Sequence, residues 1–195
     1  LPQIRANLDD AETRALAESF GVPVLINANL RDGSLREAAV ENGTKILLYE
    51  AGQALRFDEL SIRAGLRGII NVLAQLGMVK TRRKIKKFEP FIAYKSVWVR
   101  AGASGIVRDL KQLGDQVGRN EILSEIGDPF GLVLEKVKAT RSGIVIGKQN
   151  IPLVQEGDAM FHIAYFKEDD DEVAGHIEAM QETLLPDDNF QSPVT

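Results

Sequence analysis

The sequence predicts an α/β protein: a partial α/β sheet domain followed by a small all-β domain. In residues 1–79, short apolar runs alternate with amphipathic stretches of helical periodicity, which is the pattern of a sheet covered by helices. From residue 90 to residue 166, the pattern changes to short β-rich runs separated by glycines. Residues 80–89 between them are strongly basic and typical of a solvated linker. Residues 167–195 form an acidic, polar tail.

The composition excludes several classes of protein. The 195 residues are 44% hydrophobic and 27% charged, which suits one ordinary or two small packed domains. No apolar run reaches the roughly 18–20 residues of a membrane span. The net charge of −4 argues against general nucleic-acid binding, and the absence of cysteine rules out disulfides and thiolate sites. We expect a cytoplasmic protein without nucleic-acid or membrane partners, and homo-oligomerisation stays open.

Three helices are predicted from their capping signals. Asp10 is a cap-type residue before a helix at residues 11–20. Ser34 and Glu37 form the Ser-x-x-Glu pattern of a capping box, in which each side chain bonds the backbone of the other residue. The longest helix is expected at residues 58–76, where leucine, isoleucine and valine form a broad apolar face.

Glu50 is the strongest candidate for chemistry. Residues 22–26 and 44–49 are both apolar enough for buried strands, and Glu50 follows the second run directly. Ligands of open α/β sheets gather outside the carboxyl ends of strands, where a carboxylate can act as a general base. A glutamate at a strand end also commonly forms a salt bridge, and its position alone favours that structural role.

Two arginines are candidates for binding an anionic group. Arg36 lies in the first turn of the second predicted helix, and a guanidinium binds carboxylates through two parallel hydrogen bonds. Arg5 lies in an extended Pro-Gln-Ile-Arg stretch. Either side chain can equally well face solvent, so the sequence does not decide between the two roles.

An internal repeat organises the second half. Ser-Gly-Ile-Val at residues 104–107 recurs at residues 142–145, and each copy leads to a Gly-Asp pair, at 114–115 and at 157–158. We expect each glycine to adopt positive φ in a tight turn, with the aspartate bonding the turn backbone. The two related units would face one another as a small sandwich.

This repeat resembles the biotinyl/lipoyl carrier domains, which carry their cofactor on a lysine at a hairpin between the two halves. The corresponding turn, residues 127–131, reads Gly-Asp-Pro-Phe-Gly and has no lysine. Lys136 and Lys138 come later, within the next strand. The resemblance therefore implies a barrel-sandwich architecture, and a carrier role is not expected.

A complete catalytic site within this chain is not expected either. Catalytic zinc usually needs three protein ligands, and the two histidines, His162 and His176, lie in a terminal strand and in the tail. No histidine stands in a His-x-x-Glu pair, and no serine stands in a Gly-x-Ser-x-Gly elbow. We assign no metal ligand to this chain.

Several segments together resemble the succinylglutamate desuccinylase/aspartoacylase family, relatives of the zinc carboxypeptidases. The resemblance covers nearly the whole chain except the tail, and its strength lies in the order of the segments. The matching segments are residues 1–6, 33–36, 49–52, 63–68 and 156–161.

The resemblance implies a zinc-dependent hydrolase that cleaves the amide of small N-acyl amino acids. In that family the zinc ligands, two histidines and a glutamate, precede the part that matches Leu1, so we expect zinc as a cofactor with its ligands upstream. Glu50 matches the general base, and Arg36, with Arg5 as a further candidate, matches substrate binding. The chain starts without a methionine, and we expect it to be a processed or truncated product that is inactive alone.

Two other functions remain open. The β-rich segment supports a non-catalytic binding or interaction module, which would fold alone and leave Glu50 dispensable. An ester-cleaving relative of the same family is a closer alternative, because the pocket residues that select the bond and the acyl group lie outside this sequence.

Overall fold

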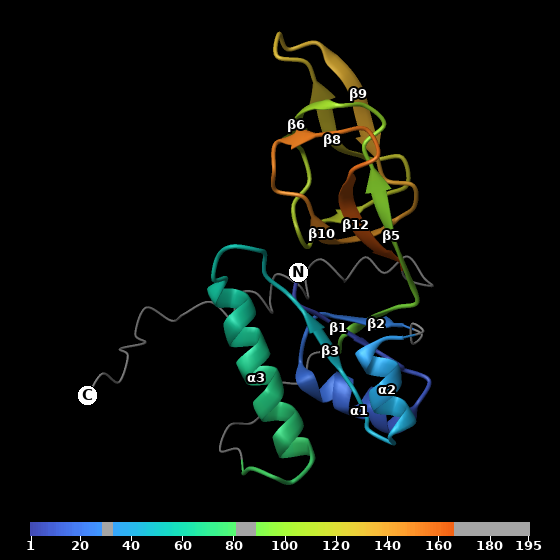
Figure 1. Ribbon diagram of the computed structural model, residues 1–195, viewed down its shortest axis with the longest axis vertical. Helices are drawn as coiled ribbons and strands as arrows, with labels where there is room; N and C mark the ends of the chain where they lie inside the picture. The colour runs from blue at the N-terminus through green and yellow to red at the C-terminus, as the bar shows by residue number, and fades with distance from the viewer. Residues whose placement is uncertain (29–32, 81–88, 166–195) are drawn as a thin grey trace, which may run out of the picture.

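The computed structural model describes residues 1–28, 33–80 and 89–165, and within them the chain forms a mixed α/β structure with three four-stranded sheets (Figure 1). Most of the predicted linker, the whole of the predicted tail and His176 lie outside the described residues. The α/β architecture predicted from the sequence is confirmed. No strand pairing joins the two β-rich sheets into a closed barrel in this part of the chain.

The first sheet has the strand order β3-β1-β2-β4. Strands β1, β2 and β4 run parallel, and β3 is antiparallel to β1 at the edge. Strand β4 comes from the start of the β-rich segment and pairs with β2. The bounds are β1 Gln3–Ala6, β2 Val24–Asn27, β3 Leu48–Glu50 and β4 Phe91–Ala93. Strand β3 is shorter than the predicted strand at residues 44–49, and it is half-buried because it lies at the edge.

The three predicted helices are present as α1 (Ala11–Phe20), α2 (Leu35–Glu41) and α3 (Glu59–Gln75). Each begins at a residue whose side chain accepts a backbone N–H of the first turn. The capping box of α2 is only half formed. The Ser34 hydroxyl accepts the Glu37 N–H, but the Glu37 carboxylate accepts the N–H of Gly33 at 2.6 Å instead of that of Ser34.

The remaining strands form two antiparallel sheets, which we call the β unit. Their orders are β5-β12-β10-β7 and β11-β6-β8-β9, and they share one hydrophobic cluster that includes Leu123, Phe161 and Ile163. The bounds are β5 Lys95–Arg100, β6 Gly105–Asp109, β7 Gln116–Val117, β8 Ile122–Gly127, β9 Val133–Lys138, β10 Gly143–Lys148, β11 Leu153–Val154 and β12 Ala159–Tyr165.

The Gly-Asp turns of the repeat are confirmed. Gly114 and Gly157 have φ of 93° and 91°, a region that favours glycine. The Asp115 carboxylate accepts the N–H of Gln112, and that of Asp158 accepts the N–H of Gln155, both at 2.8 Å. The two halves of the β unit therefore repeat the same turn.

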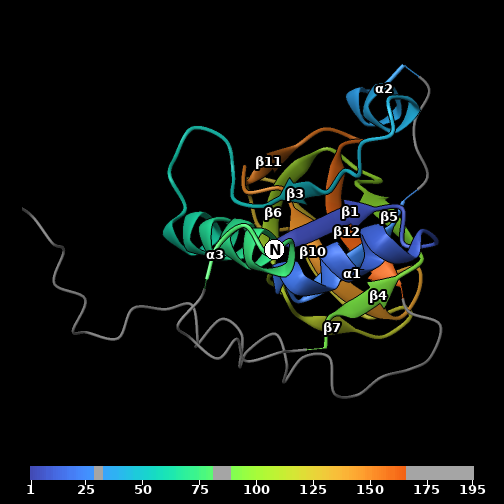
Figure 2. The same ribbon diagram turned by 90° about the horizontal axis from the view of Figure 1, so that it is seen from below.

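The first sheet is covered on both faces. Its lower face packs on α1 through a cluster that includes Ile4, Phe20 and Leu25. Its upper face packs on β10 and β12, where Val24 and Ile26 join a cluster with residues of the β unit. Figures 1 and 2 show the β unit on one side of the sheet and α1 on the other. Polar side chains on the upper face are therefore enclosed between the two units.

The outer side of α3 is strongly apolar. Its exposed large side chains include Ile62, Leu66, Ile69 and Ile70, each at least 42% exposed. None of the helices in the described part of the chain is both long and apolar enough to cross a membrane.

Candidate functional site

Glu50 lies at the carboxyl end of β3, directly opposite Gln3 in the antiparallel pairing with β1. Because β3 runs against the other strands, this position adjoins the amino ends of β1, β2 and β4. Glu50 thus ends its own strand, as predicted, but it does not lie at the edge where the carboxyl ends of the parallel strands meet. The side chain lies on the same face of the sheet as Arg5 and Gln3, with which it forms hydrogen bonds.

One oxygen of the Glu50 carboxylate holds two donors. Oε2 accepts Nε of Arg5 at 2.6 Å and Nε2 of Gln3 at 3.0 Å. The Arg5 side chain is 18% exposed and that of Glu50 is 40% exposed. The other oxygen, Oε1, has no hydrogen-bond partner among the described residues. The carboxylate is thus held on one side and open on the other.

Gln3 is buried, with 5% of its surface exposed. Its amide nitrogen bonds Glu50, but its own oxygen, Oε1, is buried and has no hydrogen-bond partner within residues 1–28, 33–80 and 89–165. A buried unpaired acceptor costs free energy, about 1–3 kcal/mol, so such atoms are uncommon in folded proteins. This one lies in the residue that holds Glu50.

His162 of β12 belongs to the same site. It is 8% exposed, and its ring stacks on the indole of Trp98, with centroids 4.6 Å apart. The pKa of His162 is lowered to about 4, mainly by burial and also by the positive charge of Arg5, while the charge of Glu50 acts in the opposite direction. The imidazole is therefore uncharged at neutral pH, and it does not compete with Arg5 for the Glu50 carboxylate.

Sequence reasoning missed this role of His162. The residue alternates with apolar neighbours in a terminal strand, and a polar residue in such a strand was the available signal. Its neighbours Arg5 and Glu50 come from the other unit, and no local pattern connects them.

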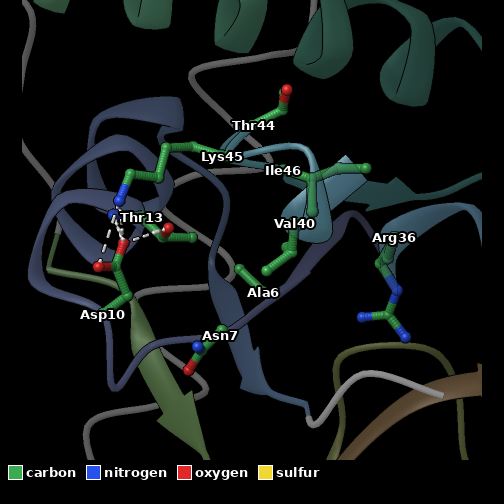
Figure 3. A pocket seen from close by; sticks show the side chains of 10 residues that line it. Ala6, Asn7, Asp10, Thr13, Arg36, Val40, Thr44, Lys45 and Ile46 are labelled. Atoms are coloured by element: carbon green, nitrogen blue, oxygen red, sulfur yellow. Dashed lines mark hydrogen bonds and ion pairs between the residues drawn. The ribbon is translucent and has the colours of Figure 1, made fainter. Parts of the chain in front are cut away.

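Arg36 lines a different cavity, of about 190 Å³. This cavity lies beyond the carboxyl end of β1, next to Ala6, and also contains Asp10 and Lys45. Figure 3 shows Lys45 turned toward Asp10, to which it is ion-paired at 3.3 Å, with the Arg36 guanidinium lying apart from this pair. One guanidinium nitrogen of Arg36, Nη1, is buried and has no hydrogen-bond partner among the described residues.

The structure therefore brings Arg5 and Glu50 together and leaves Arg36 apart. Arg36 and Glu50 share no hydrogen bond or ion pair in the described part of the chain. Gln3, opposite Glu50, and Ala6, in the Arg36 cavity, are separated along β1 by three residues, about 10 Å.

The described residues do not form a zinc site. No group of three or more histidine, cysteine, aspartate or glutamate side chains is arranged for a metal in residues 1–28, 33–80 and 89–165. Glu50 and His162 supply at most two ligands, and a catalytic zinc usually takes three from the protein. What the site offers chemically is a carboxylate with one free oxygen beside a guanidinium.

No protein-family model matches this sequence, and no curated protein is similar to it. Solved structures share its fold. The ectoine utilization protein EutE (DoeB) of Ruegeria pomeroyi superposes with a TM-score of 0.73 at 21% identity, over 84% of this chain and 55% of its own. A succinylglutamate desuccinylase/aspartoacylase of Rhodobacter sphaeroides gives 0.70 at 23% identity, over 86% and 54%. A succinylglutamate desuccinylase of Silicibacter sp. gives 0.67 at 19% identity, over 85% and 54%.

These likenesses confirm the resemblance predicted from the sequence at the level of the fold. The chain has the fold of structures described as succinylglutamate desuccinylases and aspartoacylases. It spans little more than half the length of these three structures.

Proposed function

We propose that this chain is part of a hydrolase that cleaves the amide of small N-acyl amino acids, with Glu50 as its general base. The observation that carries the proposal is the Glu50 carboxylate, which has one oxygen held by two donors and the other free. It occurs in the fold of solved desuccinylases. A general base needs an unoccupied oxygen within reach of the proton that it accepts.

In this proposal the chain supplies three functions. Glu50 accepts a proton from the attacking water and returns it to the leaving amine. Arg36 is the proposed ligand of the substrate carboxylate, although here it lines the cavity beyond the carboxyl end of β1, apart from Glu50. Arg5 bonds Glu50 through Nε, so its terminal amino groups remain donors for a substrate oxygen.

Zinc dependence is a further part of the proposal. The described residues do not hold the metal, and the resemblance places the three ligands on a segment before Leu1. Glu50 lies opposite Gln3, so residues joined to Leu1 would begin close to it. The chain alone should therefore bind no stoichiometric zinc and hydrolyse nothing. One tightly bound zinc per chain in metal analysis would contradict this.

The β unit completes the proposed enzyme as a biotinyl/lipoyl-like barrel-sandwich beside the entrance of the site, admitting small substrates. The turn between β8 and β9 carries no lysine, and Lys136 and Lys138 both lie within β9. A carrier function is not part of the proposal. We also propose that the protein is cytoplasmic.

The central test is Glu50→Gln in an active protein that contains this chain with its preceding segment. We expect kcat for N-acyl amino acid hydrolysis to fall about 10²- to 10⁴-fold, the usual contribution of a general base. Glu18→Gln is the matched control, because Glu18 also pairs with an arginine Nε but lies on the outside of α1. Turnover near normal in Glu50→Gln would remove Glu50 from the mechanism.

A non-catalytic binding module is the second candidate, and the Glu50–Arg5 ion pair itself favours it, since a strand-end glutamate in a salt bridge needs no reaction to explain it. In that case Glu50→Gln leaves binding and any activity unchanged. An esterase is distinguished by the substrate: the parent would cleave acyl esters and leave the matching amides intact.

A further inference from the structure

We propose that Arg5 and Gln3 are positioning residues, which hold the Glu50 carboxylate in one orientation so that Oε1 faces the reacting water. The inference rests on the proposed function of Glu50 as a general base and goes beyond it. It concerns how the base is aimed.

The geometry of the sheet supports this positioning role. Gln3 and Arg5 are two residues apart on β1, so their side chains emerge on the same face. Glu50 is the cross-strand partner of Gln3. Both donors therefore reach the same oxygen from a rigid strand, and the carboxylate cannot rotate without losing one of them.

The unpaired oxygen of Gln3 supports the same role. If the amide were turned over, its oxygen would face the Glu50 carboxylate, and two acceptors would repel each other. The observed orientation keeps a donor on Glu50 and leaves Gln3 Oε1 buried and unpaired. An arrangement that only stabilised the fold would gain by satisfying that atom. The need to hold Glu50 in place explains why Gln3 Oε1 stays unpaired.

The surroundings of Arg5 also support this role. The buried ring of His162 lies near both Arg5 and Glu50 and is itself held by stacking on Trp98. Glu50 is the one carboxylate that pairs with Arg5 among the described residues. In the described part of the chain, the guanidinium thus has no competing carboxylate partner.

The test separates aiming from substrate binding in an active protein that contains this chain. Arg5→Met and Gln3→Met should each lower kcat about 10- to 100-fold, the effect of a small misplacement of a reacting group. Gln3→Met, which removes no proposed substrate contact, should change KM less than about threefold. Arg5→Gln, which keeps an N–H donor, should recover part of the loss. Arg14→Met is the matched control, because Arg14 bonds Glu18 through Nε at 2.8 Å on the exposed side of α1.

A direct readout is available on this chain without activity. NMR couplings of the Glu50 side chain should report a single rotamer in the unmodified protein and rotamer averaging in the Arg5→Met, Gln3→Met double variant. A rise in KM with unchanged kcat in Arg5→Met, or a Glu50 rotamer that stays fixed in the double variant, would overturn the positioning role. If Glu50→Gln keeps full activity while the rotamer depends on Arg5, the proposed function fails and the pairing stands.

Discussion

At the scale of single residues, the site depends on groups whose charge is set by burial. His162 is enclosed between the two units and stays neutral because desolvation and the positive charge of Arg5 disfavour its protonated form. Its neutrality matters for Arg5, since a second cation in the same space would compete for Glu50. The protonation of His162 therefore couples stability to the integrity of the Glu50–Arg5 pair.

This coupling gives a pH prediction. The pKa of His162 falls from 6.5 to about 4 on folding, so between these values the unfolded chain binds a proton that the folded chain does not. The contribution of His162 to stability is present above about pH 6.5 and is lost as pH falls toward 4, by about 1–3 kcal/mol.

The measurement is urea unfolding from pH 7.5 to 4.5 in the unmodified chain and in His162→Phe, which keeps an aromatic ring against Trp98. The variant should show the weaker pH dependence. Parallel curves for the two proteins over this range would contradict the assignment.

At the scale of elements, α1 and α3 pack closely at a glycine. A Cβ added to Gly68 would lie 2.0 Å from Cε1 of Phe20, well inside contact distance. The Phe20 ring has little room to move, because it is buried in the cluster between α1 and the first sheet. It also contacts the Tyr49 ring, with centroids 5.2 Å apart. Nearby, Asn71 of α3 donates to the Phe20 carbonyl at the end of α1.

We expect Gly68→Ala to destabilise the chain by about 2 kcal/mol or more. Alanine is better than glycine in a helix by about 1 kcal/mol, but overpacking of a full core typically costs about 1–3 kcal/mol and here meets a rigid ring. Denaturant unfolding measures the difference. Gly118→Ala is the control, because Gly118 is exposed and a Cβ added to it would meet no atom closer than 3.6 Å. This variant should change stability by less than about 0.5 kcal/mol. A Gly68→Ala variant as stable as the control would show that Phe20 can move aside.

At the scale of the whole molecule, the two units share a hydrophobic cluster. Ile144 and Ile146 of β10 are both at most 2% exposed and pack against Val24 and Ile26 of the first sheet. The same interface encloses Arg5 and His162. The β unit is thus a structural part of the Glu50 site.

We expect the units to unfold together. Ile144→Ala should reduce the free energy of unfolding by about 2–5 kcal/mol, as for other fully buried large-to-small changes. It should destabilise both units together. Fluorescence of Trp98, the single tryptophan, reports the β unit, and far-UV circular dichroism reports helices, which in the described chain lie in the α/β layer.

Coincident transitions by the two probes, shifted equally by Ile144→Ala, are the expected result. Ile151→Ala is the control, because Ile151 is 66% exposed. Two separate transitions, with the variant affecting Trp98 alone, would show that the β unit folds independently, as the binding-module alternative requires.

The sequence by itself determined the local structure. The start of α1 at Asp10, the three helices and the glycine turns at Gly114 and Gly157 all follow from residues a few positions apart, because caps and turns are made between near neighbours. It also singled out Glu50 at a strand end. The sequence did not show which edge of the sheet Glu50 would lie at, because the direction of β3 is set by pairing with β1 and not by its own residues.

The tertiary structure alone decided what surrounds Glu50. Arg5 is 45 residues away in the chain and reaches it through the antiparallel register of two strands. His162 comes from the other unit and meets the pair because nearby apolar residues, Ala164 of the same strand and its cross-strand partner Ile144, pack onto the first sheet. Such contacts depend on register and on packing between elements, which no local pattern in a single sequence encodes.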